Sequence, residues 1–292
     1  MLYKIPLDVE VGPDFPLLRL PRFIHISRTS DMSKIIAIAN QKGGVGKTTT
    51  SVNLAACLAV AEKRTLLIDM DPQANATSGY GSPIGDEAPS IYEVLVQDKP
   101  LGDIIRETDV PYLRLAPSHI RLTGAEVEMV SVISRERRLE EALEAARGEY
   151  DYIFIDCPPS LGLLTLNALT AADSVLIPIQ CEYYALEGLS KLMNTLKLVQ
   201  RHLNPKLEIE GVLLTMFDGR LNLSRQVADE ARAHFGERVY KTVIGRNVKL
   251  GEAPSFGKPI ILYDIMSAGA QNYISLAGEV LASESEEVLI HG

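Results

Sequence analysis

The chain has 292 residues, of which 46% are hydrophobic, 6% aromatic and 23% charged, and its formal net charge is −9. This composition is ordinary for a globular chain with a good-sized core, but the absence of tryptophan argues against aromatic platforms for single-stranded nucleic acid. An acidic chain does not wrap nucleic acid with its whole surface, so any such contact requires a local basic patch. The cysteines, Cys57, Cys157 and Cys181, are far apart, which favours free thiols in a reducing cytosol over a disulfide framework.

The first 31 residues differ in character from the rest of the chain. They mix acids, prolines and apolar residues without the basic start and continuous apolar core of a signal peptide. No stretch of the chain is long and apolar enough to span a bilayer. Because Met32 directly precedes the first strong strand signal, we expect that Met32 is the natural start or that residues 1–31 form a disordered arm. An intact mass that matches a start at Met1 would remove the first option.

Apolar, β-branched runs alternate with helical patterns along the remaining chain. Strands are predicted at 34–40, 64–71, 151–159, 173–180 and 210–217, and helices at 48–63, 135–147, 161–171, 185–203 and 222–235. Because the strands are apolar throughout and helices separate them, the pattern predicts an α/β fold with a parallel sheet covered on both faces. We expect one domain over residues 33–280, a long surface loop at 81–90 and an acidic tail at 281–292 that frays.

The stretch NQKGGVGKTTT, residues 40–50, follows the first predicted strand and opens the first predicted helix. Gly46, Lys47 and Thr48 fit the end of a phosphate-binding loop, although Gln41 stands where the common pattern has its first glycine. Glycines let backbone N–H groups face a phosphate, and the start of the helix adds its dipole. Lys47 is expected to reach the β- and γ-phosphates, and the Thr48 hydroxyl to bind Mg²⁺. The expected nucleotide contacts in this loop are Gly43, Gly44, Val45, Gly46, Lys47, Thr48 and Thr49.

Three aspartates follow buried strands of the predicted sheet. Asp156 ends an apolar run at the position where a carboxylate holds Mg²⁺ or its water in phosphate-loop proteins. Asp69 and Asp71 close the second predicted strand, and two acids spaced i, i+2 on an extended segment point the same way. Beside a nucleotide, one of this pair can steer the attacking water. Each acid taken singly also fits a solvated strand end.

Several separate motifs resemble one family. The stretches KGGVGKTTT, DMDPQANATSGYG, DYIFIDCPPSLGLLTLNAL, PIQCEYYALEGL and IGRNVKLGEAPSFGKPIILYD are similar to those of the ParA/Soj chromosome-partitioning ATPases. That group has a deviant phosphate loop and also includes MinD and the nitrogenase iron protein. The resemblance covers residues 33–278 and leaves out the first 31. It implies a P-loop NTPase fold, with ATP and Mg²⁺ as ligands and the hydrolysis of ATP to ADP and phosphate as the reaction.

The resemblance also implies roles for individual residues. Members of the family dimerise around two ATP molecules, and Lys42 matches the lysine that crosses to the partner's nucleotide. Asp71 matches the residue that positions or activates water, and Asp69 would lie close to the metal. Arg246 and Asn247, in the stretch IGRNV, are expected near the adenine. Relatives usually have proline where this chain has Gly245, which implies a looser loop.

Basic residues are concentrated in one part of this acidic chain. Residues 219–258 contain eight basic and four acidic side chains, a local net charge of +4 in a chain whose total is −9. Such a surface can contact DNA phosphates without reading base sequence, although the same charges could equally solvate helix faces. By resemblance, Arg220 and Lys249 match DNA-contacting positions of the family. The family also implies a ParB-type partner, nonspecific binding of double-stranded DNA, and a cytoplasmic protein associated with the nucleoid.

Other functions remain open for this sequence. A membrane-positioning ATPase of the MinD kind would need a basic amphipathic C-terminal helix, but the tail ASESEEVLIHG is acidic, so we expect no membrane binding. A nitrogenase-like electron-transfer protein would need cysteines placed to share a cluster, and none of the three lies in such a segment. A regulator that only docks on other proteins would bind ATP without hydrolysing it. The sequence does not indicate whether the cargo is a chromosome or a plasmid.

Overall fold

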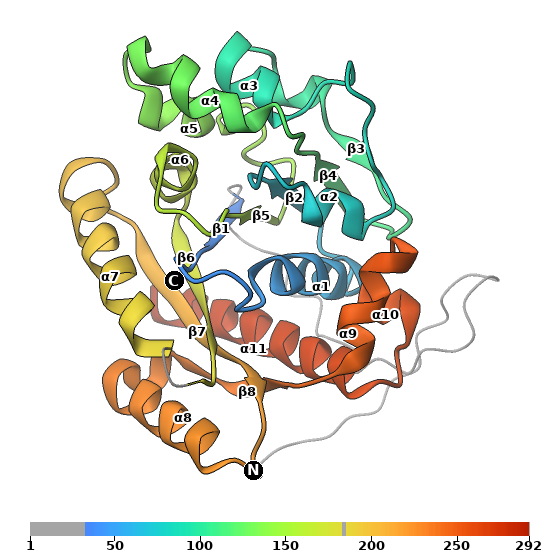
Figure 1. Ribbon diagram of the computed structural model, residues 1–292, viewed down its shortest axis with the longest axis vertical. Coiled ribbons are helices and arrows are strands. Elements are labelled where there is room, and N and C mark those ends of the chain that lie inside the picture. The colour runs from blue at the N-terminus through green and yellow to red at the C-terminus, as the bar shows by residue number, and fades with distance from the viewer. Residues whose placement is uncertain (1–32, 183–184, 292) are drawn as a thin grey trace.

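The computed structural model describes residues 33–182 and 185–291, so the segment 1–31 and the proposed start at Met32 lie outside the described residues. The fold is built on an eight-stranded sheet in the order β3-β4-β2-β5-β1-β6-β7-β8 (Figure 1). Neighbouring strands run parallel, except for the antiparallel pair β3 and β4. The mostly parallel sheet predicted from the sequence is therefore confirmed. The strands are β1 Lys34–Ile38, β2 Thr65–Asp69, β3 Arg106–Glu107, β4 Leu113–Ala116, β5 Tyr152–Asp156, β6 Ser174–Gln180, β7 Glu208–Phe217 and β8 Val239–Gly245.

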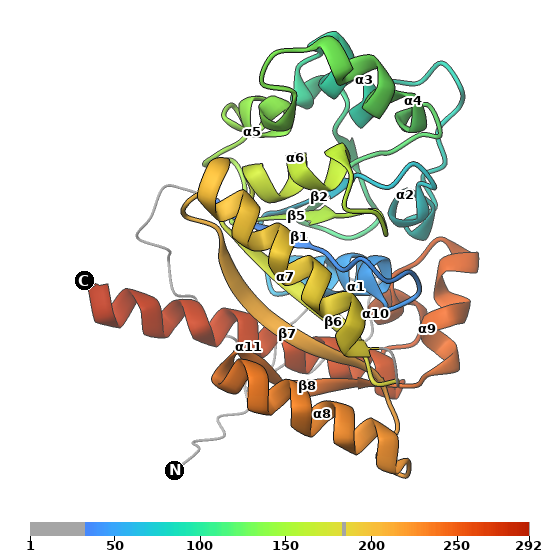
Figure 2. The ribbon, with the colours of Figure 1, turned by 60° about the vertical axis from the view of Figure 1, so that its left-hand side comes forward.

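Helices cover both faces of this sheet (Figure 1; Figure 2). The buried residues on one face come from α3 Ile91–Gln97, α4 Leu122–Glu128, α5 Arg138–Leu143, α6 Leu163–Ala171, α7 Ala185–His202 and α8 Asn222–Phe235. Those on the other face come from α1 Lys47–Val60, α2 Asn75–Gly79, α9 Val248–Glu252, α10 Ile260–Tyr263 and α11 Ala268–His291. Short 3-10 helices lie at Leu101–Asp103, Met129–Ser131, Arg135–Arg137, Gly236–Arg238 and Ala253–Phe256.

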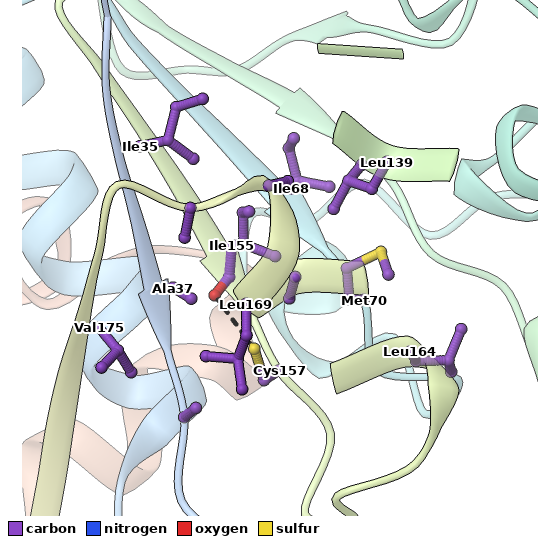
Figure 3. Packing of buried hydrophobic residues seen from close by; sticks show 14 of the residues in the cluster. Ile35, Ala37, Ile68, Met70, Leu139, Ile155, Cys157, Leu164, Leu169 and Val175 are labelled. Atoms are coloured by element: carbon purple, nitrogen blue, oxygen red, sulfur yellow. Dashed lines mark hydrogen bonds between the residues drawn. The ribbon is translucent and has the colours of Figure 1, made fainter. Parts of the chain in front are cut away.

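Side chains on the two faces of β1 pack into two separate apolar layers. Ile35 and Ala37 belong to the layer with α6, whereas Ile36 and Ile38 belong to the layer with α1. Figure 3 shows the first layer, in which Ile35 and Ala37 of β1 lie near residues of the neighbouring strands, and Ala37 lies near Leu169 of α6. Burial of one isoleucine or leucine side chain stabilises a fold by about 1.5–3 kcal/mol. This double burial is the reason why the strand is apolar at successive positions instead of at alternate ones.

Several elements differ from their predicted bounds. The helix expected at 135–147 contains only α5, preceded by a 3-10 turn, and the strand expected at 64–71 ends at Asp69. The backbone of the acidic tail, which we expected to fray, continues α11 to His291. The segment 81–90 is an irregular loop on the surface, with half of its residues exposed, as expected. In the described residues, no helix is both long and apolar enough to cross a membrane.

Candidate nucleotide-binding site

The loop that joins β1 to α1 is held in a tight curve by its own polar groups. The Asn40 side chain donates to the Pro178 carbonyl at 2.7 Å and accepts the Lys42 N–H at 3.0 Å. Gly44 and Gly46 have φ angles of 73° and 87°, in the left-handed region that favours glycine. Gly43 is not among the residues with positive φ, so the backbone conformation requires two of the three glycines that we expected to provide the bend.

The first turn of α1 presents unsatisfied N–H groups at the end of this loop. Gly46 precedes the helix and provides no side-chain cap, and α1 is 14 residues long. The N–H groups of a first helical turn have no partner within the helix, and with the helix dipole they form an anion-binding site. From the opposite side, the Thr215 hydroxyl of β7 donates to the Val45 carbonyl at 2.8 Å and fixes the loop against the sheet.

Lys47 lies almost fully buried between the loop and the acidic side chains. Its side chain turns back along the loop, where Nζ donates to the Lys42 carbonyl at 3.2 Å. Burial lowers the pKa of Lys47, and the negative charge of Asp156 opposes that change. A buried ammonium group placed next to carboxylates has a position and a charge suited to a phosphate.

Asp156 ends β5 and is hydrogen-bonded by two residues of α1. Its carboxylate accepts the Thr48 hydroxyl at 2.8 Å and the Ser51 hydroxyl at 2.7 Å. Burial, followed by the charge of Asp69, raises the pKa of Asp156. The sequence analysis identified Thr48 and Asp156 separately, and the fold brings them into contact. Ser51 was missed, because a serine inside a predicted helix gives no signal of its own.

Asp69 lies beside Asp156, but its carboxylate already has protein partners. The two residues are paired in register where β2 meets β5, and both are completely buried. Asp69 Oδ1 accepts the Asp71 N–H at 3.1 Å, and Oδ2 accepts the N–H and the hydroxyl of Thr77, each at 2.8 Å. Asp71 follows the end of β2, and its Oδ1 accepts the Gln73 N–H at 3.0 Å. Asp69 and Asp71, which the sequence analysis treated as a pair, therefore have different surroundings.

A cavity of about 440 Å³ lies directly beside the phosphate loop. It is bordered by Gly46 and Thr49 from the loop and α1, and by the predicted base-contact residues Arg246 and Asn247. The fold thus places the late loop next to the phosphate loop. The remaining lining residues are Thr215, Met216, Ile244, Gly245, Val248, Leu250, Gly251 and Tyr273. Thr215, Met216 and Tyr273 were missed, because they come from segments without a recognisable motif.

Three charged side chains from the phosphate loop, the late loop and the segment after β6 lie close to one another. The Arg246 guanidinium donates to Glu182 Oε1 at 2.7 Å, and Lys42 Nζ lies 4.0 Å from Glu182 Oε2. The side chain of Lys42 is 31% exposed, whereas Lys47 is only 6% exposed. The Asn247 side chain accepts the Lys249 N–H at 2.9 Å and caps α9, which leaves its amide N–H groups for other partners.

The predicted basic surface consists of exposed charges that are paired with neighbouring acids. Arg220 is 90% exposed and forms an ion pair of 2.7 Å with Asp218, whose pKa its hydrogen bonds lower to about 2. Lys249 forms an ion pair of 2.9 Å with Glu252. Asp218 lies just outside the segment 219–258, so the sequence count overlooked the acid nearest to Arg220. The two predicted DNA contacts are thus accessible but locally neutralised.

The strand, glycine-rich loop and helix, with an aspartate at the end of the adjacent strand, define a P-loop nucleotide-binding fold. A family model described as an AAA domain matches residues 33–209. The sporulation initiation inhibitor protein Soj of Bacillus subtilis is 64% identical over 252 residues, which are 86% of this chain and all of the relative. The chromosome partitioning protein ParA of Myxococcus xanthus is 57% identical, over 87% of this chain and 90% of the relative. The chain therefore belongs to the Soj/ParA family of chromosome-partitioning ATPases.

Solved structures agree with the fold. Cobyrinic acid a,c-diamide synthase from Mycobacterium smegmatis, with bound ADP and magnesium, has a TM-score of 0.70 and 39% identity, covering 77% of this chain and 93% of that one. The septum site-determining protein MinD from Pyrococcus horikoshii, complexed with Mg-ADP, has a TM-score of 0.71 and 28% identity, covering 85% and 96%. The P-loop fold expected from the resemblance is confirmed.

Proposed function

We propose that this protein is an ATP-driven switch that dimerises, binds DNA and moves it by hydrolysing ATP to ADP and phosphate. The main support is the continuity of one site: buried Lys47, the Thr48–Asp156 contact and a nucleoside-sized cavity all adjoin the same loop. Phosphate groups on the loop and a base in the adjacent cavity would together occupy this site.

Within this proposal, the phosphates are held by the N–H groups of residues 43–49 and by the Lys47 ammonium group. Thr48 and Asp156 would hold Mg²⁺, and they fit that ion because both offer oxygen ligands. The described residues contain no group of three or more His, Cys, Asp or Glu side chains able to hold a metal. Mg²⁺ is usually bound by only one or two carboxylates together with substrate phosphates, so this donor set is sufficient. The bound ion would neutralise charge on the phosphates.

Asp71 is the proposed acceptor for the attacking water. Its Oδ1 accepts the Gln73 N–H, and among the described residues Oδ2 has no hydrogen-bond donor. Asp69 is assigned an indirect role at the metal, through its charge and through the N–H of Asp71 that it binds. Arg246 and Asn247 are assigned to the base, since both border the cavity.

Lys42 is proposed to act on the nucleotide of a second copy of the chain. The Lys42 side chain is 31% exposed, and its pairing with Glu182 at 4.0 Å is weak at such a position. A lysine supplied by the partner completes the charge around the phosphates only when a dimer forms, as an arginine finger does. ATP would then favour the dimer, and hydrolysis would release it.

The dimer is proposed to bind double-stranded DNA nonspecifically through Arg220 and Lys249 and to respond to a ParB-type partner. Both basic side chains are accessible, and a dimer doubles the number of phosphate contacts, which strengthens weak binding through avidity. In a cell, this activity would place the protein in the cytoplasm on the nucleoid.

Light scattering and DNA co-sedimentation with ATP, ADP or no nucleotide test this function. We expect the mass of an Asp71→Ala variant to double with Mg-ATP, and DNA binding by the wild type to require ATP. Lys42→Ala should lose both effects, whereas Lys197→Ala, an exposed change on α7, should lose neither. A mass that Mg-ATP leaves unchanged would contradict the dimer, and DNA binding that is indifferent to nucleotide would contradict the switch.

The similarity to MinD supports a second candidate, in which ATP controls binding to a membrane. Membrane binding of this kind uses a basic amphipathic helix, whereas the end of α11 carries the acidic sequence ESEE. Co-sedimentation with liposomes that contain anionic lipids separates the two candidates. We expect no ATP-dependent binding to the vesicles, and its presence would favour the membrane function.

A further inference from the structure

Four residues near the proposed site of hydrolysis form a closed ring of hydrogen bonds. Asp69 Oδ1 accepts the Asp71 N–H at 3.1 Å, and the Asp71 carbonyl accepts the Ser118 hydroxyl at 2.7 Å. The Ser118 N–H donates to the Thr77 hydroxyl at 2.9 Å, and that hydroxyl donates to Asp69 Oδ2 at 2.8 Å. The ring joins the end of β2, the helix α2 and the segment after β4.

The ring fixes Asp71 through its main chain and leaves its carboxylate available. Both the N–H and the carbonyl of Asp71 have partners within the ring. The same carbonyl also accepts the Ala74 N–H at 2.9 Å, which closes the turn that begins at Asp71. Only Oδ1 of the carboxylate accepts a bond, from the Gln73 N–H. Rotation of the side chain is therefore the main freedom that remains to this residue.

Burial makes the ring rigid. Asp69 and Ser118 are 0% exposed and Thr77 is 1% exposed, so water cannot take the place of a broken hydrogen bond. Removal of the Thr77 hydroxyl would leave the Ser118 N–H without its acceptor and would remove one of the three donors to the Asp69 carboxylate. Unpaired buried polar groups are costly, so the ring favours a single arrangement of the loop that contains Asp71.

We propose that Thr77 and Ser118 are positioning residues that hold Asp71 at the distance from the phosphates that hydrolysis requires. This inference rests on the proposed function, which makes Asp71 the acceptor for water. Neither residue is among those that line the nucleotide cavity in the described part of the chain, so both act on Asp71 and leave nucleotide binding to other residues. A displacement of about 1 Å in a reacting group can lower a rate about 100-fold.

A matched pair of substitutions at Thr77 separates the hydroxyl from the shape of the side chain. Thr77→Val keeps the shape and removes the hydroxyl, whereas Thr77→Ser keeps the hydroxyl and removes a methyl group. We expect Thr77→Val and Ser118→Ala to lower kcat for ATP roughly 10- to 100-fold with KM unchanged. Thr77→Ser should retain kcat within roughly threefold of the wild type.

A control shows whether the removal of any buried hydroxyl has the same effect. Thr170 of α6 is also buried, and its hydroxyl donates to the Leu166 carbonyl at 2.7 Å. Thr170→Val should leave kcat unchanged. Thermal unfolding and the affinity for a fluorescent ATP analogue, measured for every variant, show that the folded fraction and nucleotide binding are retained at the assay temperature.

The outcomes distinguish this inference from the proposed function. If the wild type hydrolyses no ATP, even with DNA present, the proposed function fails and the inference fails with it. If the wild type hydrolyses ATP and Thr77→Val retains full kcat, the inference alone is overturned. The same holds if Asp71→Ala retains full kcat, or if Thr77→Ser is as impaired as Thr77→Val. A rise in KM at unchanged kcat would also overturn it, because it would place Thr77 in nucleotide binding.

Discussion

Two charged regions of the molecule are built in opposite ways. At the phosphate end, which comprises residues 40–51, 69–71 and 156, the side chains of Lys47, Asp69, Asp71 and Asp156 are buried and hydrogen-bonded to neighbouring polar groups. On the basic face, which comprises Arg220, Lys249 and their acidic partners, the charges are exposed and each is paired with its nearest acid. Folding alone fixes the geometry of the phosphate end. On the basic face, a binding partner has to compete with solvent and with the paired acids for the basic side chains.

This contrast explains why the two regions differ in how readily they are recognised. Buried polar groups require specific partners at specific spacings, so the phosphate end leaves a motif in the sequence. Exposed ion pairs contribute little free energy and tolerate many arrangements, so the basic face leaves only a local excess of charge. Four experiments test this difference, each directed at one property of one region.

The largest effect is expected from Lys47→Ala at the phosphate end. The change removes the buried cation of the site, and we expect the rate of ATP hydrolysis to fall at least about 100-fold. The release of phosphate, measured at saturating Mg-ATP, checks this result. The exposed change Lys197→Ala is the control and should retain the rate. A Lys47→Ala variant with more than a tenth of the wild-type rate would contradict the assignment of Lys47.

A pH titration tests how strongly burial acts on Asp156. Burial, together with Asp69, raises the pKa of Asp156 from 3.8 to about 7 in the folded protein. Between these pH values, the folded state therefore binds more protons than the unfolded state. Proton binding to Asp156 stabilises the folded state at low pH, and this stabilisation is lost as pH rises towards 7. In protein free of metal and nucleotide, the free energy of unfolding should fall by on the order of a few kcal/mol over that window.

The same titration on Asp156→Asn isolates the contribution of this carboxyl group. The variant should lose less stability between pH 5 and pH 7.5 than the wild type, because an amide does not titrate there. Urea unfolding at several pH values provides the measurement. Parallel curves for the two proteins would show that burial does not perturb Asp156, and the contrast between the two regions would then be weaker than the contacts suggest.

On the basic face, removal of a cation and removal of its acid should have opposite effects. Arg220→Ala should weaken ATP-dependent binding to duplex DNA by about three- to tenfold, and Asp218→Asn should strengthen it by a similar factor. The slope of log affinity against log salt should fall by about 1 for each phosphate that a variant no longer neutralises. Fluorescence anisotropy at several salt concentrations measures both quantities.

Arg64→Ala provides the matched control for the DNA experiment. Arg64 is also exposed and paired with an acid, Asp151, but it lies outside the basic face. We expect its removal to change neither the affinity nor the salt slope. Equal effects of Arg64→Ala and Arg220→Ala would show that overall charge, and not this surface, determines binding to DNA.

The smallest effect is expected from Ala74→Gly, next to the Asp71 turn. Ala74 has a φ of 53°, in the left-handed region that is unfavourable for a residue with a Cβ atom. Glycine there should raise the free energy of unfolding by about 0.5–1 kcal/mol. Ala76→Gly, within helix α2, should lower it instead. Chemical unfolding of both variants measures the two changes in the free energy of unfolding. A destabilised Ala74→Gly variant would contradict the inference that the backbone at Ala74 is strained.

Different parts of the fold were predictable to different degrees. The central strands β1, β2, β5, β6 and β7 follow from continuous apolar runs, because a strand buried on both faces is apolar at most successive positions. The strands β3, β4 and β8 were missed, since they are short or interrupted by polar residues and owe their conformation to pairing with neighbours. The helix expected at 135–147 is shorter in the structure, because the helical pattern of the sequence does not indicate the residues at which the helix begins and ends.

The sequence by itself determined the phosphate loop, the acids that follow the strands, and the parallel sheet that carries them. These features depend on local backbone requirements and on continuous apolar runs, and both can be recognised from consecutive residues in the sequence. Only the tertiary structure decided that Thr48 and Ser51 share Asp156, that Asp218 neutralises Arg220, and that Thr77 and Ser118 hold Asp71. Except for the local pair of Asp218 and Arg220, these contacts join different segments of the chain, so no spacing along the chain encodes them.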